Sequence, residues 1–85
     1  MLIEFPLEGA PEVVSLGRHP RCEIRINNAS ISRQHAEFRR DAHGEYTVVD
    51  NQSSNGTFVN GQRVPSARIR GGDVILCGSF ELTFL

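Results

Sequence analysis

Lysine and tryptophan are absent from this 85-residue chain, and cysteine occurs only twice. All nine basic residues are arginines. We attribute this preference for arginine over lysine to genome composition. Only an arginine in a loop is a candidate for bidentate contacts with an anion. The ten acidic residues bring the formal net charge to -1. The chain therefore lacks the clustered excess of base typical of nucleic-acid-binding proteins, and we expect no nucleic-acid partner.

Long hydrophobic runs are also missing. No apolar stretch approaches the ~20 residues that span a bilayer. The chain opens on a strand pattern rather than on a charged segment followed by an apolar one, so we expect neither a signal segment nor a membrane partner.

The two cysteines, Cys22 and Cys77, are far apart in sequence and form no CxxC pair. Disulfide-stapled domains of this size usually carry more cysteines, so we expect reduced thiols and a cytoplasmic location. Cys22, His19 and His43 have no recognised ligand spacing, and we expect no metal site and no cofactor.

Short strands dominate what is present. Apolar residues alternate with polar ones at a period of two, and no helical period is sustained. The ranges with this pattern are 2–5, 12–16, 24–26, 35–40, 45–50, 57–59, 62–64, 74–77 and 80–84. Glycine-rich turns separate them, and Asn60-Gly61 is a strong two-residue hairpin signal because both positions need φ > 0. The sequence predicts a single all-β domain over residues 1–85, a sandwich of two sheets, which we expect to be one module of a longer protein.

Four polar motifs interrupt the hydrophobic pattern, so each belongs to a loop or a strand end. They are Gly17-Arg18, Ser32-Arg33-Gln34-His35, Ser54-Asn55-Gly56-Thr57 and Asn60-Gly61. Loops on a rigid scaffold are where binding residues concentrate. A guanidinium, hydroxyls and a side-chain amide together form a good receptor for a phosphate monoester, which carries about -1.5 to -2 charge and three acceptor oxygens.

Strand parity predicts which of these loops meet. Strands 35–40 and 45–50 run out and back, so the loop that carries Ser32 and the loop 51–56 lie at the same end of the sandwich. Only strand 24–26 separates the loop of Arg18 from that of Ser32, which by parity places these two loops at opposite ends. That strand is about 10 Å long at ~3.3 Å per residue, a distance that an arginine and a bent loop can cover.

Each motif also has a purely structural interpretation. Arg18 can be a solvated loop residue, Ser32 can cap a turn, and Asn55-Gly56 can simply be a turn. We interpret His35 as a structural residue whose ring hydrogen-bonds the backbone and braces the loop of Ser32. Asn60-Gly61 we interpret as wholly structural.

In combination, the motifs resemble the forkhead-associated (FHA) domain, a phosphothreonine-binding module. The resemblance extends over essentially the whole chain, and the order and spacing of its motifs are specific. The matching runs are Gly17-Arg18, Glu23-Ile24-Arg25-Ile26, Ile31–Ala36, Ser53–Gly61 and Gly72-Asp73-Val74-Ile75.

The resemblance implies a SMAD/FHA-like sandwich of about eleven short strands with the binding loops at one end. It implies that Arg18 and Ser32 are direct phosphate ligands and that Arg33 adds a further contact. Ser54 and Asn55 would hold the peptide main chain beside the phosphothreonine. The positions that would support the site are Gly17, His35, Gly56, Thr57, Asn60 and Gly61.

The implied partner is a phosphothreonine-containing protein or peptide, which depends on an upstream Ser/Thr kinase. The chain departs from the family pattern at Glu23, where Asp is usual, and at Ser54, where Thr is frequent. These departures bear on peptide preference more than on phosphate binding.

Two other function classes compete with this interpretation. Ser32 and His35 could be a nucleophile and its base, but residues three apart at a strand entrance point in different directions, and no nucleophile elbow is present. We therefore expect no enzyme activity. The alternative that stays open is a phospho-independent interaction or self-association domain that uses the same loops.

Overall fold

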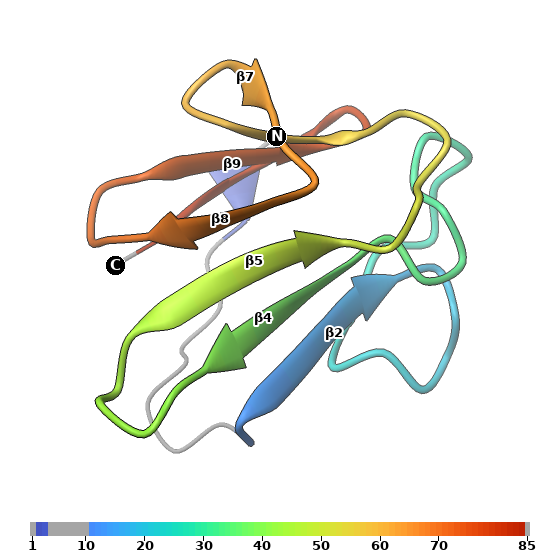
Figure 1. The fold of residues 1–85 in the computed structure, drawn as a ribbon. Helices are drawn as coiled ribbons and strands as arrows, with labels where there is room; N and C mark the ends of the chain where they lie inside the picture. Colours follow the sequence, from blue (N-terminus) through green and yellow to red (C-terminus); the bar gives the residue numbers. More distant parts are fainter. Residues whose placement is uncertain (1, 4–10, 85) are drawn as a thin grey trace.

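The structure, a computed structural model, describes residues 2–3 and 11–84. Two five-stranded sheets pack face to face as a sandwich (Figure 1). In spatial order, the first sheet contains β1 (Leu2–Ile3), β10 (Phe80–Thr83), β9 (Val74–Cys77), β6 (Thr57–Val59) and β7 (Gln62–Arg63). The second sheet contains β3 (Ile24–Arg25), β2 (Val13–Gly17), β4 (Ala36–Arg40), β5 (Tyr46–Asp50) and β8 (Ser66–Ile69). Within the described part of the chain, no helix has the length and apolar character needed to cross a membrane.

The core lies between the two sheets and follows from the period-two alternation. In β2, Val14 and Leu16 are completely buried, whereas their neighbour Val13 is 43% exposed. The buried hydrophobic residues of both sheets form one cluster: Val14, Leu16, Ile24, Ile26, Ile31, Ala36, Phe38, Val48, Ile69, Ile75, Cys77, Phe80 and Leu82. Burial raises the pKa of the Cys77 thiol to about 12, so this thiol stays protonated and packs as a small apolar group.

The predicted turns are present. Asn60 and Gly61 have φ of 50° and 85°, the left-handed geometry that a two-residue hairpin between β6 and β7 requires. The β4–β5 hairpin turns at Asp41–Gly44, with the Asp41 carboxylate accepting hydrogen bonds from the N–H groups of His43 (2.8 Å) and Glu45 (3.0 Å).

The all-β sandwich is confirmed, with two differences in its strands. Ten strands lie within the described residues, against the implied number of about eleven. The pattern missed β8, which has only two inward-facing apolar residues, Ala67 and Ile69, and is recognisable as a strand mainly from its pairing with β5. Of the predicted strand 2–5, β1 covers Leu2–Ile3, and residues 4–5 lie outside the described residues.

The parity expectation for the loop of Arg18 was wrong, because β3 does not run antiparallel to β2. The two strands pair in parallel, with Leu16 opposite Ile24 and Gly17 opposite Arg25. The chain therefore leaves β3 at the same end of the sheet at which it left β2. Each of the two strands contributes only two residues to this pairing. The six residues 18–23 are therefore enough to connect them, whereas longer parallel strands need a crossover of a dozen residues or more.

Matched substitutions in β2 test the arrangement of the core. Val14→Ala removes two buried carbons and leaves a cavity, so we expect a loss of about 2 kcal/mol in the free energy of unfolding. Val13→Ala, the same change on the exposed face, should cost less than about 0.5 kcal/mol. Urea denaturation of both variants provides the measurement, and equal losses would contradict the assignment of the two faces.

Candidate functional site

Three loops meet at one end of the sandwich (Figure 1). They are the Arg18 loop (residues 18–23), the Ser32 loop (residues 26–35) and the Asn55 loop (residues 51–56). The backbone N–H of Arg18 donates to the Ser32 carbonyl at 3.2 Å, and that of His19 donates to the Arg33 carbonyl at 3.1 Å. The Ser54 N–H donates to the Ser32 hydroxyl oxygen at 3.0 Å. The predicted site residues Arg18, Ser32, Arg33, Ser54 and Asn55 are thus brought together.

Gly17 permits the close contact between the Arg18 loop and the Ser32 loop. A Cβ at this position would lie 2.2 Å from the Arg33 carbonyl oxygen and 2.9 Å from its carbon, both backbone atoms that cannot move aside freely. Any side chain here would separate the two loops. The predicted supporting role of Gly17 therefore has a steric basis.

Arg18 and Ser32 differ in how much of their hydrogen-bonding capacity is already used. The Arg18 carbonyl accepts from Nε of Arg25 at 3.0 Å, which anchors the backbone, while the Arg18 side chain is exposed. The half-buried Ser32 hydroxyl accepts from the Ser54 N–H, so its own proton remains available to donate. Both side chains can therefore donate to an anion.

The buried His35 ring joins the Ser32 loop to the Asn55 loop. Its Nδ1 accepts from the Ser32 N–H at 3.1 Å, and its Nε2 lies 2.8 Å from the Gly56 carbonyl oxygen. Since Nδ1 accepts, the ring proton must be on Nε2, which donates to Gly56. Both ring nitrogens are occupied by backbone groups, so neither can take the Ser32 hydroxyl proton as a general base would.

A polar cluster beneath the Asn55 loop was missed by sequence reasoning. The Asp50 carboxylate accepts hydrogen bonds from the Ser53 hydroxyl, from the Ser53 N–H (3.2 Å) and from the Thr57 hydroxyl (2.8 Å). The Ser53 hydroxyl oxygen in turn accepts from the Gly56 N–H at 3.0 Å. Burial raises the pKa of Asp50, but the hydrogen bonds from Ser53 and Thr57 together outweigh it and leave the pKa below its usual value. The available signal was an aspartate at a strand end with a serine three residues later, a common turn pattern.

Gly56 has two constraints of its own. Its φ of +87° is strained for other residues, and a Cβ here would lie 2.7 Å from Nε of Arg63. The side chain of Arg63, a residue of β7, therefore lies directly against the Asn55 loop. Sequence reasoning did not anticipate this contact.

Ser30 ties both the Asn55 loop and the opposite sheet to the Ser32 loop. Its carbonyl accepts from the Asn55 side-chain amide at 2.8 Å, and its hydroxyl oxygen accepts from the Ser79 N–H at 3.1 Å. A Cβ on Gly78 would lie 2.3 Å from the Ser30 carbonyl oxygen. The β9–β10 turn therefore packs tightly against the binding end.

Asn60 and Gly61 lie in the β6–β7 hairpin, outside the three loops. The Asn60 amide donates to the Asp73 carboxylate at 3.1 Å and its oxygen accepts from the Val74 N–H at 2.9 Å. These contacts tie the hairpin to the start of β9 and agree with a structural role.

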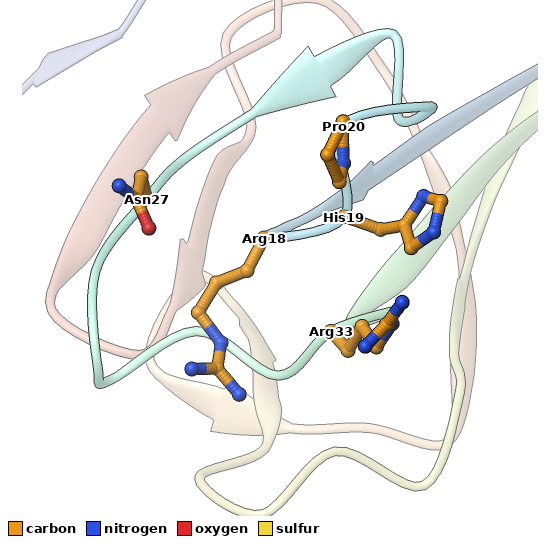
Figure 2. Close-up of a pocket in the computed structure, with 5 residues that line it drawn as sticks. All are labelled: Arg18, His19, Pro20, Asn27 and Arg33. Atoms are coloured by element: carbon orange, nitrogen blue, oxygen red, sulfur yellow. The ribbon is translucent and has the colours of Figure 1, made fainter.

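A cavity of about 250 Å³ opens between the Arg18 loop and the Ser32 loop (Figure 2). It is lined by Arg18, His19, Pro20, Asn27 and Arg33. Two guanidinium groups, an imidazole and an amide therefore surround one hollow, with no carboxylate in its lining. Such a donor set suits a phosphate or carboxylate group.

Metal binding has no comparable basis. Among the residues that the structure describes, no three His, Cys, Asp or Glu side chains gather as metal ligands. The expectation of no metal stays a prediction.

The Asp50 cluster leads to a pH-dependent prediction. Because the pKa of Asp50 lies below its ordinary 3.8 in the folded protein, the carboxylate's contribution to stability is complete well above that value. It is lost as the pH falls through the lowered pKa. The wild type should therefore be more stable than Asp50→Asn at neutral pH, and this difference should shrink below about pH 4. Urea unfolding at pH 7 and pH 3 measures it, and a constant difference would contradict the ionised cluster.

Comparison with known proteins gives matches over most of the chain. Residues 14–78 match the family model of the FHA domain. The glycogen accumulation regulator GarA of Mycolicibacterium smegmatis is 48% identical over 71 residues, which cover 84% of this chain and 44% of that protein. The chain spans about half the length of the curated relatives it matches.

Solved structures agree in fold. The second FHA domain of a Mycobacterium tuberculosis ABC transporter matches with a TM-score of 0.78 and 40% identity, over 88% of this chain and 68% of that one. A structure from work on phosphothreonine-dependent FHA domain interactions matches with a TM-score of 0.76 and 33% identity, over 81% of this chain and 71% of that one. With the three-loop site in place and residues 14–78 matched, the chain belongs to the FHA domain family.

Proposed function

We infer that this domain binds phosphothreonine in partner proteins that a Ser/Thr kinase has modified. The observation that carries the proposal is the hydrogen bonding that joins, at one end of the sandwich, the three loops that carry the Arg18 guanidinium, the Ser32 hydroxyl and the Asn55 amide. Residues 1–85 act as one binding module of a longer protein. The relatives' FHA domains, one of them studied for phosphothreonine-dependent interactions, support the same ligand class.

The phosphate is held by Arg18, Ser32 and Arg33. Arg18 supplies a planar fork of N–H donors, and the Ser32 hydroxyl supplies a further proton. Arg33 follows Ser32 directly and adds either its backbone N–H or its guanidinium. Charge-assisted hydrogen bonds contribute roughly 1.5–3 kcal/mol each, so three of them supply about 4.5–9 kcal/mol before the ordering costs, a large part of the about -8 kcal/mol of a micromolar complex.

The peptide main chain is held by the Asn55 loop. The Asn55 amide nitrogen donates to the Ser30 carbonyl, which orients the side chain and leaves its oxygen free to accept a peptide N–H. Ser54 lies beside it, with its backbone fixed by the Ser32 hydroxyl. Gly17, His35, Gly56 and Thr57 set the backbone positions from beneath.

The role is binding and not catalysis. His35, the candidate base that the sequence places beside Ser32, has both ring nitrogens bonded to backbone groups. The proposal places the protein in the cytoplasm, where its unpaired cysteines, Cys22 and Cys77, stay reduced.

A titration with three forms of one peptide tests the proposed function. We expect micromolar binding of the phosphothreonine form and no measurable binding of the unphosphorylated form. The phosphoserine form should bind about fourfold more weakly, because it lacks one methyl group that a small apolar niche would bury at ~0.8 kcal/mol. Equal affinity for phosphorylated and unphosphorylated peptides would instead favour a phospho-independent interaction domain.

Arg18→Ala should remove measurable binding without unfolding the domain. The variant loses the central cationic donor, worth at least about 2 kcal/mol or thirtyfold in affinity. Arg18 is exposed, and the hydrogen bonds of its backbone remain, so the urea midpoint should stay within error. Arg39→Ala, on the outer face of β4, is the control for the loss of one positive charge. Retained affinity in Arg18→Ala would refute the role of this residue.

A further inference from the structure

The two sheets differ in the side chains that they present on their outward faces. A sheet that buries one face in the core normally presents polar side chains on the other. The second sheet largely follows this rule, since the outward residues Glu37 and Arg39 of β4 form an ion pair at 3.3 Å. Its outward valines, Val13 and Val49, each lie opposite one of these two charged residues. The outward face of the second sheet therefore suits water.

The first sheet departs from this rule. In β9, Ile75 and Cys77 are buried in the core. Val74 and Leu76 alternate with them and therefore point away from the core, on the side of the sheet that faces away from β2 and β4 (Figure 1). Phe58 of β6 lies directly opposite Leu76 and shares its face. Contiguous apolar side chains on an outward face are typical of interaction surfaces.

One row of side chains crosses this face from strand to strand. Glu81 in β10 pairs with Leu76 in β9, which in turn pairs with Phe58 in β6. Phe58 pairs with Arg63 in β7. The row therefore runs from an acid through two apolar residues to a base. Glu81 and Arg63 are both exposed, and neither forms an ion pair with another residue in the part of the chain that the structure describes.

This order of side chains is self-complementary. A two-fold axis that runs along the strands, between Leu76 and Phe58, turns the row over and reverses it. Glu81 of each copy then lies opposite Arg63 of the other copy. Leu76 of each copy likewise lies opposite Phe58 of the other. Sheets that pack face to face keep their strands within about 30° of one another, so this axis is compatible with ordinary sheet packing.

We propose that the outward face of the first sheet binds a second copy of this chain through this two-fold arrangement, with Glu81 of each copy paired with Arg63 of the other. This interface is independent of the proposed function, because its side chains are not among those assigned to the phosphate or the peptide. An axis along the strands leaves the strand direction unchanged, so both binding ends face the same way in the dimer. Arg63 also lies against Gly56, which places the interface next to the Asn55 loop.

The size of the face predicts a weak dimer. The row crosses β10, β9, β6 and β7. Strands about 4.8 Å apart and about 14 Å long give a flat face of roughly 19 by 14 Å. This face is well below the ~800 Å² that each partner buries in a stable interface. We therefore expect a dissociation constant of about 0.1 to 1 mM.

Charge reversal at the two ends of the row tests the arrangement. Sedimentation velocity of the chain between about 0.02 and 2 mM should show the wild type shifting from monomer to dimer. Glu81→Arg and Arg63→Glu each place like charges opposite one another and should raise the dissociation constant at least about tenfold. Both residues are exposed, so the urea midpoints of the variants should stay within error.

Mixing the variants tests the two-fold axis itself. Glu81→Arg has two positive ends in its row and Arg63→Glu has two negative ends, so an equimolar mixture should associate although neither variant does so alone. A mixture of Glu81→Arg with Arg39→Glu has the same pair of net charges, but the changed Arg39 lies on the second sheet. This control mixture should associate at least about tenfold more weakly than the matched one.

Three results would overturn the interface. One is a wild type that stays monomeric over the whole concentration range, which would leave the face to another part of the longer protein or to a different partner. Another is unchanged self-association of either single variant. The third is equal association of the matched and the control mixtures, which would indicate general attraction between opposite net charges. None of these results bears on the titration with phosphothreonine peptides, so the proposed function would stand.

Discussion

The bridge that the buried His35 ring makes between the Ser32 N–H and the Gly56 carbonyl is the contact on which the binding end depends. It satisfies two backbone groups that burial would otherwise leave unpaired, and it sets the separation of the loops that carry the Ser32 hydroxyl and the Asn55 amide. An apolar residue could fill the same space but could not hold these two backbones at a fixed separation. The His35 ring with its proton on Nε2 holds both backbones at once.

The rest of the binding end continues this design with polar contacts rather than apolar packing. The Asp50 carboxylate organises the Asn55 loop from below, and Ser30 joins that loop to the Ser32 loop and to the opposite sheet. Gly17 and Gly78 allow backbones to approach to distances that no side chain would permit. The exposed hydrogen-bond donors of the site therefore belong to loops whose backbone is already hydrogen-bonded. Little backbone ordering is then required when a ligand binds.

The sequence allowed most of the fold and part of the site to be predicted. Alternation revealed nine strand ranges, and the Asn60-Gly61 turn was predicted down to its positive φ angles. Strand β8 was not predicted, because its two inward-facing apolar residues are too few to define an alternating pattern. Parity misplaced Arg18 because nothing local distinguishes a parallel β3 from an antiparallel one; that choice is made by pairing with β2. Asp50 was missed because its role exists only once Ser53 and Thr57 fold back onto it.

The bond from the Ser79 N–H to the Ser30 hydroxyl joins residues 49 positions apart in the chain. The final geometry of the Ser32 loop therefore depends on the closed β9–β10 hairpin. Bringing together groups so far apart in sequence has an entropic cost that the contacts of the whole fold must offset. A chain without this hairpin would lack both the bond to Ser30 and two strands of the first sheet, so competence to bind is a property of the complete domain. By the same linkage, a bound peptide stabilises both sheets and not only the loops it touches.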